Sequence, residues 1–257
     1  MQSRTNYETE AIVLRHFDYG ESDRIVNFYT ADFGKVKGIA KGARRSQKRF
    51  ANTLEPFSHI NLLFSRQRQE GLALIEAGKV INHYARIRGN LGKTLYASYL
   101  VDITDQFTIE NKTNDGLFRL VGDFLELLDI GDASEDLIRF FEMRLLRLVG
   151  YEPVLDRCVT CRTPVTSGAM YHFSVREGGL KCGLCAPVGC DFLGVSMGTI
   201  RSMLLGKELE RERLCSLILS EQCARESRHF LERFIAHLLG KELKSLHVIR
   251  EIRALGI

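Results

Sequence analysis

Four cysteines in two close pairs are the side chains of this sequence with the clearest chemistry. Cys158 and Cys161 form one C-x-x-C pair, Cys182 and Cys185 form the other, and 20 residues separate the pairs. Two residues between cysteines make a short turn that directs both thiolates toward one point, and two such turns complete a tetrahedral site of four sulfurs. The spacing therefore predicts a zinc ion. Its role should be structural, because four thiolates leave no open position for water or substrate.

Two other interpretations of these cysteines stay open at this point. A redox C-x-x-C opens a helix after a buried strand, and neither pair follows an apolar strand. The cysteines could also be core thiols without metal, although four in this pattern favour a metal. Cys190 lies close enough to be an alternative ligand, His172 falls outside the ligand spacing, and Cys215 and Cys223 read as small core residues.

The cysteine-rich insert, at about residues 156–187, interrupts a region of helical periodicity. Between the pairs, residues 171–175 and the glycines at 178 and 179 predict a hairpin. Ser134 is the expected N-cap of one helix and Gly150 its stop, while Gly206 and Gly240 are expected to end two later helices. The segment 243–257 receives no assignment. The predicted helices cover residues 91–107, 115–128, 134–149, 196–205 and 221–239.

The first 79 residues read as a separate β domain with alternating patterning. Turn residues separate five short strands, which fits an OB-fold barrel, although an SH3-like barrel gives nearly the same pattern. The predicted strands are 8–16, 23–30, 35–41, 57–66 and 72–77, with a polar tip at 67–71 before the last. The expected fold is thus α+β, with a five-stranded OB-fold domain over 1–79 and an all-helical domain with a four-cysteine zinc-ribbon insert over 80–257.

The net charge of +4 is concentrated at the N-terminal end of the chain. Residues 1–80 contain 13 basic and 9 acidic side chains, and the other 23 basic and 23 acidic side chains balance. Seven of the basic residues follow one another without an intervening acid: Lys35, Lys37, Lys41, Arg44, Arg45, Lys48 and Arg49. On a strand, Lys35, Lys37 and Lys41 share one face with Ile39, and the arginines follow in a loop.

This basic stretch predicts salt-sensitive binding to a nucleic-acid backbone. Aromatic side chains that stack on bases usually accompany such charge in OB-folds, and some of the nearby aromatic residues must instead be core. A solvated edge strand protected by lysines is the alternative, and it explains seven uninterrupted charges poorly. The stacking candidates are Phe17, Tyr19, Phe28, Tyr29 and Phe50.

Other patterns in the sequence give no sign of catalysis. The segment Gly89–Thr94 resembles a phosphate-binding loop, but only two residues separate its glycines where four are needed, so it should open the following helix. The carboxylate pairs Glu8/Glu10 and Asp102/Asp105 read as solvated. No apolar run approaches the ~20 residues that span a bilayer, and the polar N-terminus lacks a signal-peptide core, so the expected location is the cytoplasm.

The sequence as a whole resembles the RecO family of bacterial recombination mediators. The most specific segments are Ala40-Lys-Gly-Ala-Arg-Arg45 and Gly150-Tyr-Glu-Pro before the cysteines. Asp23-Arg-Ile-Val, Thr30–Lys35 and Leu239-Gly-Lys-Glu-Leu-Lys-Ser occur in the expected order around them. Within these segments, Lys35, Lys41, Arg44 and Arg45 match the basic DNA-binding stretch of the family, and Arg24 matches an arginine that is either DNA-binding or structural.

The resemblance implies a non-enzymatic DNA repair and recombination mediator of the RecF pathway, associated with the nucleoid. Such proteins bind single- and double-stranded DNA and anneal complementary strands without ATP. They pair with RecR, contact the C-terminal tail of single-stranded DNA-binding protein and help load RecA on coated strands. Whether RecF is needed is left open. An OB-fold RNA-binding protein with a structural zinc ribbon is the alternative function.

Overall fold

The computed structural model describes residues 5–46, 48–66, 71–186 and 193–255. Within these ranges the chain divides into two compact units, residues 1–132 with 248–257, and residues 133–247. The expected boundary near residue 79 stays a prediction; the first unit continues beyond it to residue 132. Cys190 and most of the polar tip at 67–71 lie outside the described residues.

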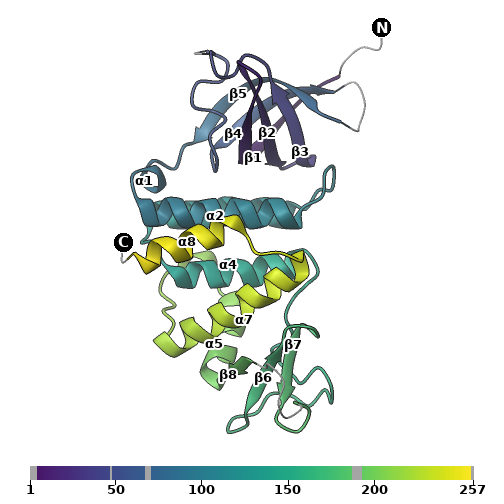
Figure 1. Cartoon of the computed structure of the whole chain (residues 1–257), viewed down its shortest axis with the longest axis vertical. Helices are drawn as coiled ribbons and strands as arrows, with labels where there is room; N and C mark the ends of the chain where they lie inside the picture. Colours follow the sequence, from purple (N-terminus) through teal and green to yellow (C-terminus); the bar gives the residue numbers. More distant parts are fainter. Residues whose placement is uncertain (1–4, 47, 67–70, 187–192, 256–257) are drawn as a thin grey trace. The chain divides into compact units, whose positions relative to one another are not determined.

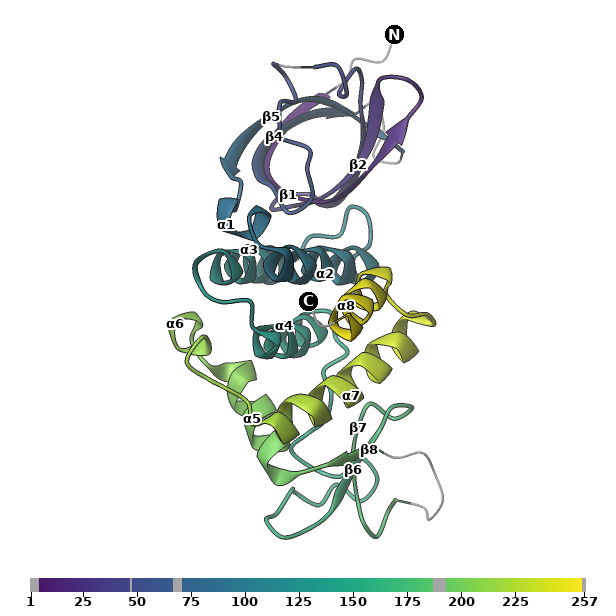
Figure 2. The same ribbon diagram turned by 60° about the vertical axis from the view of Figure 1, so that its left-hand side comes forward.

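A closed barrel begins the first unit, and Figure 2 shows it as a ring. The strands are ordered β1-β2-β3-β5-β4, with β3 and β5 parallel and the other pairs antiparallel, and this confirms the predicted OB-type barrel. Strand β2 has the predicted bounds, and β1 is longer than predicted at both ends. The strands are β1 (Thr5–Tyr19), β2 (Asp23–Thr30), β3 (Gly34–Ala40), β4 (His59–Arg66) and β5 (Ala73–Asn82).

Alternation along the strands builds the barrel core. In β3, Val36 and Ala40 point inward, whereas Lys35, Lys37 and Ile39 point outward. Neighbouring strands add inward Val, Ile, Leu and Phe side chains, so that the interior is filled by apolar groups. The period-two pattern thus places the basic residues of β3 on the outer surface, as predicted.

The rest of the first unit is helical and packs beside the barrel (Figure 1). Asn90 caps α2 by accepting a hydrogen bond from the Lys93 amide, which confirms that the loop-like segment 89–94 opens a helix. In the β2–β3 turn, Gly34 has φ +62°, and any Cβ there would overlap the Lys112 carbonyl. The helices are α1 (Ala85–Arg88), α2 (Leu91–Phe107) and α3 (Asp115–Ile130), and α8 (Lys244–Ala254) joins them from Val248 onward.

A buried carboxylate on α2 connects the barrel to the helices. Asp105 is 2% exposed, and its side chain receives a hydrogen bond from the Asn27 amide at 3.1 Å. Arg15 and Lys35 form ion pairs with it at 2.9 and 2.8 Å, and the Lys35 ammonium also donates to the Asp105 carbonyl. The expectation of a solvated Asp102/Asp105 pair is therefore wrong for Asp105, because residues distant in sequence supply donors that the helix pattern does not reveal.

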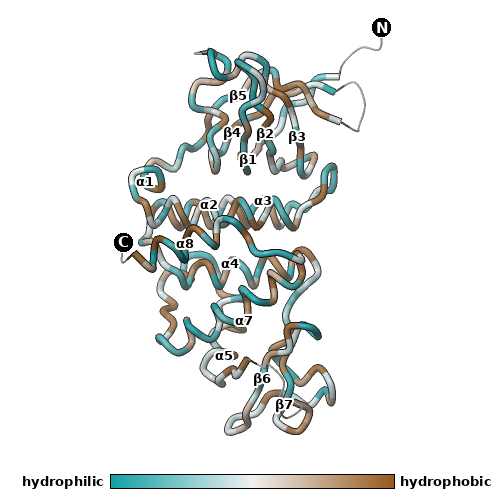
Figure 3. The backbone as a smooth tube through the Cα atoms, in the orientation of Figure 1, coloured by the Kyte–Doolittle hydropathy of each residue, from teal (hydrophilic) through white to brown (hydrophobic). Residues whose placement is uncertain are grey.

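The second unit packs helices around a small antiparallel sheet. Phe173 in strand β6 (Tyr171–Ser174) packs against Phe230 in helix α7 (Glu221–Leu239) with ring centroids 4.7 Å apart, so the predicted hairpin is anchored to a helix. Figure 3 shows hydrophobic and hydrophilic segments alternating along the helices, as expected of amphipathic elements. The elements are α4 (Glu135–Leu148), β6 (Tyr171–Ser174), β7 (Gly179–Cys182), β8 (Leu193–Val195), α5 (Met197–Glu208), α6 (Arg211–Leu214) and α7 (Glu221–Leu239).

The predicted helix ends are partly confirmed. Ser134 caps α4, and Gly240 ends α7 with φ +67°. Gly206 does not end α5, which continues to Glu208. Its lack of a side chain serves packing instead, because a Cβ at this position would overlap the Phe140 ring.

We expect Asp105→Asn to destabilise the protein by about 3 kcal/mol, because the change leaves the largely buried Lys35 ammonium without its negative partner and also breaks the ion pair with Arg15. Urea unfolding followed by circular dichroism measures this difference. Asp132→Asn, an exposed change in the same unit, is the matched control and should shift stability by less than about 0.5 kcal/mol. Equal effects of the two changes would show that the buried carboxylate does not stabilise the fold.

Candidate functional site

The four predicted metal ligands come together at one end of the β6–β7 hairpin. Cys182 is the last residue of β7, and Cys185 follows in a turn in which its amide donates to the Cys182 carbonyl at 3.0 Å. Cys158 and Cys161 lie in the other turn, where the Arg162 amide donates to the Cys158 carbonyl and Arg162 has φ +61°. These two turns are the short sulfur-directing turns that the C-x-x-C spacing predicts.

The arrangement of the sulfur atoms fits a tetrahedral metal ion. All four lie within 4.8 Å of one another, and the Cys161 and Cys182 sulfurs are 3.8 Å apart. Four sulfurs at ~2.3 Å from a central zinc ion would be about 3.8 Å from each other. Only Cys158 is buried among the four, which disfavours the alternative of ordinary core thiols.

Hydrogen bonds prepare this cluster for a cation. Burial raises the pKa of the Cys158 thiol, but amides of Cys161, Cys182 and Thr160 donate to its sulfur and bring the pKa down to about 6. In contrast, the neighbouring Cys182 and Cys161 sulfurs raise the pKa of Cys185 to about 12. Four thiolates therefore repel one another without a positive charge among them, and a bound cation removes that repulsion.

Backbone pairing attaches the first cysteine turn to the hairpin. The Val159 amide donates to the Leu180 carbonyl at 2.8 Å, and the Leu180 amide donates to the Val154 carbonyl at 2.9 Å. Gly179 allows this close approach, since a Cβ there would overlap Val154 and Val159. The two halves of the cluster thus belong to one small sheet-and-turn structure.

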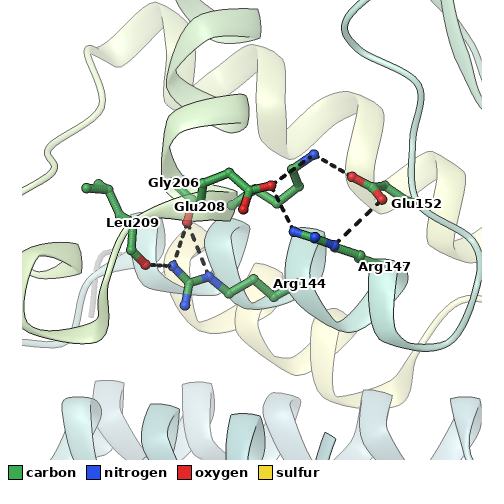
Figure 4. Close-up of polar contacts among 7 residues, drawn as sticks. Arg144, Arg147, Glu152, Gly206, Glu208 and Leu209 are labelled. Carbon is green, nitrogen blue, oxygen red and sulfur yellow. Dashed lines mark hydrogen bonds and ion pairs between the residues drawn. The ribbon is translucent and has the colours of Figure 1, made fainter. Parts of the chain in front are cut away.

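A polar network secures the segment that leads from α4 into the cluster (Figure 4). Glu152, within the Gly150-Tyr-Glu-Pro segment, pairs with Lys207 at 2.5 Å. Arg147 pairs with Glu208 at 2.8 Å and lies 4.0 Å from Glu152. Arg144 donates to the carbonyls of Gly206 and Leu209, which satisfies the C-terminal end of α5. These cations are therefore engaged within the unit.

The basic stretch divides into engaged and available side chains. Lys35 is only 14% exposed and is held by Asp105, so its charge is compensated. Arg24 pairs with Asp18 and Glu55 at the barrel end. That arrangement matches the structural alternative for this arginine. Lys37, Lys41, Lys48 and Arg49 have no carboxylate within ion-pair distance among the residues that the structure describes.

Most of these available cations lie in the loop that leaves β3. Lys41, Lys48 and Arg49 are exposed there, and Arg44 and Arg45 lie beside them, paired at 3.5 and 3.7 Å with Asp18 and Glu21. The Arg49 guanidinium donates to the Lys41 carbonyl, which draws the two ends of the loop together. The loop therefore gathers exposed positive charge in a small area.

The structure also sorts the aromatic candidates near this loop. Phe28 and Phe50 belong to the barrel core, and Tyr29 is buried, with its hydroxyl 3.4 Å from the Asn114 carbonyl. Phe17 and Tyr19 are exposed on the last part of β1. These two aromatic residues are the ones free to meet a ligand.

Two remaining side-chain expectations have different outcomes. Cys223 is buried, as predicted, whereas Cys215 is exposed, so its assignment to the core is wrong. It follows the short helix α6, where the helical pattern no longer indicates an inward face. The sequence does not reveal Arg15 and Asn27 as partners of Asp105, because their pairing joins strands to a helix far along the chain.

Among the described residues, every helix is too short or too polar to span a membrane.

Comparison with known proteins agrees with this architecture. Residues 1–84 match the family model for the recombination protein O N terminal, and residues 88–247 match the one for its C terminal. The chain is 48% identical to the DNA repair protein RecO of Syntrophus aciditrophicus over the full length of both chains. It is 36% identical to that of Geobacter metallireducens, over 95% of this chain and 97% of the relative. The chain belongs to the RecO family of DNA repair proteins.

Proposed function

We propose that this protein is a non-catalytic recombination mediator that binds DNA through the barrel and anneals complementary single strands. This proposal is carried by four cations on the outer surface of an OB-type barrel that form no ion pair with a described residue: Lys37, Lys41, Lys48 and Arg49. Because the chain belongs to a family of DNA repair proteins, we propose that this surface binds DNA. Arg44 and Arg45 extend the surface, while Lys35 and Arg24 position the strands that carry it.

Charge neutralisation explains how such a surface promotes annealing. Complementary strands repel each other through their phosphates, and a surface that replaces their counterions lowers this repulsion without consuming ATP. A nucleotide phosphate would need the lysine of the loop-like segment 89–94. Lys93 instead donates to the Asp129 carbonyl and holds α2 against α3. The proposed mediator role therefore depends on DNA binding and uses no ATP.

The proposed partners are those that the RecO family implies. We propose that the protein pairs with RecR, contacts the C-terminal tail of single-stranded DNA-binding protein, and helps RecA load on coated strands in the cytoplasm. We further propose that the ion held by Cys158, Cys161, Cys182 and Cys185 is zinc, since four thiolates in a tetrahedral arrangement suit this metal. Zinc would stabilise the fold of the cysteine-rich insert and would take part in no step of strand annealing.

The annealing of two complementary strands coated with single-stranded DNA-binding protein tests the function directly. We expect this protein to accelerate annealing without ATP, because neutralisation of the phosphates requires no hydrolysis. Fluorescence energy transfer between labelled strands measures the rate. A folded, metal-loaded protein that leaves the rate unchanged, or that prefers RNA, would contradict the proposal.

The combination Lys41→Ala with Lys48→Ala tests the surface. We expect roughly ten-fold weaker DNA binding, and a salt dependence reduced by about 0.7–0.9 in slope for each lost phosphate contact. Fluorescence anisotropy at several salt concentrations measures both quantities. Arg176→Ala with Arg225→Ala removes the same charge from exposed positions in the second unit and should bind DNA as the wild type does. Equal weakening by both pairs would point to overall charge rather than to this surface.

The change Cys185→Ala tests the metal site. We expect the purified wild-type protein to hold one zinc ion per chain and the variant to hold much less, because three thiolates bind the ion more weakly. Elemental mass spectrometry measures the content. Cys215→Ala, an exposed cysteine outside the cluster, should keep the full amount. Full metal content both in Cys185→Ala and in Cys185→Ala combined with Cys190→Ala would exclude the four-cysteine site.

A further inference from the structure

The cysteine cluster of the second unit has a buried side and an open side. Cys158 is buried, and its sulfur accepts a hydrogen bond from the Cys182 amide at 3.5 Å, whereas Cys161 is exposed. Leu184, between the two cysteines of the second turn, is 99% exposed, and Met170 beside this turn is 74% exposed. Among the described residues, the open side of the cluster is therefore within reach of small molecules dissolved in water.

The exposed sulfur of Cys161 would be in its reactive form when the cluster holds zinc. A thiol that coordinates a metal ion is deprotonated, and the thiolate is the form that attacks an oxidant. The Cys161 sulfur also lies 3.3 Å from the Thr163 hydroxyl, which donates a hydrogen bond to a thiolate at this position. Cys161 thus combines negative charge with access to solvent, and these two properties select a cysteine for oxidation.

A second sulfur is placed to react with an oxidised Cys161. The Cys182 sulfur lies 3.8 Å from that of Cys161, although it belongs to the other turn. Cys158, the partner of Cys161 in its own C-x-x-C pair, is buried, and its sulfur is held by the Cys182 amide. Cys182 is partly exposed and needs only a short approach to form a bond. The favoured disulfide therefore joins Cys161 to Cys182 and links the two turns.

We propose that Cys161 and Cys182 are a reversible oxidation site for hydrogen peroxide, and that the metal ion is released when their disulfide forms. The Cys161 thiolate attacks one oxygen of the peroxide, the O–O bond breaks, and hydroxide leaves a sulfenic acid on Cys161. The Cys182 thiolate then attacks the Cys161 sulfur and expels a second hydroxide.

Electrons and charge balance in this reaction. The two sulfurs lose two electrons and the peroxide gains them, so the ion leaves unchanged as Zn²⁺. It leaves because only the thiolates of Cys158 and Cys185 remain to hold it, where a stable site needs four ligands. This inference rests on the proposed zinc site and adds a regulation to it.

Contacts that do not involve the metal hold the insert in place after the ion leaves. The Val159 amide donates to the Leu180 carbonyl at 2.8 Å, which attaches the first turn to the hairpin. Phe173 of the hairpin packs against Phe230 of α7, with ring centroids 4.7 Å apart. A dithiol that reduces the disulfide therefore restores two turns that are still supported, and zinc binds to them again.

Peroxide treatment of the full-length, zinc-loaded protein tests the inference. The parent protein for this experiment carries Cys190→Ala and Cys215→Ala, so that these two thiols cannot exchange with the cluster. We expect peroxide to release nearly all of the zinc, which a chromogenic chelator measures. Peptide mass spectrometry after alkylation of free thiols should find Cys161 linked to Cys182. Dithiothreitol with added zinc should then restore the metal content.

Cys182→His and Cys185→His, each added to the parent protein, form a matched pair of variants. Each leaves three thiolates and one imidazole, a ligand set that also binds zinc. Cys182→His lacks the sulfur that reacts with the oxidised Cys161, so it should keep most of its zinc under the same treatment. Cys185→His retains both reacting sulfurs and should form the disulfide and lose its zinc as the parent protein does. Equal loss of zinc from the two variants would contradict the assignment of Cys182.

The disulfide map of the parent protein decides the inference even if a histidine variant binds no zinc. Zinc that stays bound under peroxide would overturn the inference, as would disulfides confined to the two C-x-x-C pairs. Oxidation of Cys161 that dithiothreitol does not reverse would overturn it too. These results would leave the proposed zinc site of the reduced protein intact. A parent protein and a wild-type protein that both purify without zinc would instead overturn the proposed metal site, and this inference with it.

Discussion

The first unit depends on one carboxylate that is held almost out of contact with water. A buried charge is costly unless donors surround it, and Asp105 obtains them from β1, β2 and β3 through Arg15, Asn27 and Lys35. The three strands must therefore present these residues at the same place. A slip of one residue would turn Lys35 and Asn27 into the core. The register that satisfies Asp105 is thus the register that puts Lys37 and Ile39 on the outer surface.

Because Asp105 needs a positive partner, the basic stretch divides into charges that stabilise the fold and charges that are available to a ligand. As a run of residues, Lys35 to Arg49 reads as a uniform band of positive charge. In the fold, Lys35 compensates a buried acid, Arg44 and Arg45 are paired with surface acids, and the remaining charge gathers around Lys41 and the loop that follows. The same kind of residue therefore stabilises the barrel at one end of the stretch and remains available to a ligand at the other.

The features that local pattern determines were predictable from the sequence. Strand β2, helix α2 and the cysteine turns depend on alternation, capping and short spacing, and the structure confirms them. The sequence pattern does not reveal the burial of Asp105, because its three donors lie 70 to 90 residues away. Nor does it reveal the packing role of Gly206, because its partner is the Phe140 ring of another helix. Which aromatic residues face outward was open too, since alternation gives two faces of a strand and only closure of the barrel decides which one is inside.

The first unit consists of two segments that are distant in sequence, so it cannot be completed until the second segment has been synthesised. Residues up to 132 leave the ribosome early, but the segment from Val248 onward, where Arg253 donates to the Tyr96 hydroxyl on α2, is made only after the second unit. The barrel strands and the metal-ligating turns can form while translation continues. Helix α8 reaches its place against α2 only after the whole intervening unit has emerged. A nascent chain that stops short of residue 248 would therefore lack the contact of Arg253 with Tyr96, and its first unit would stay incomplete although most of that unit was synthesised first.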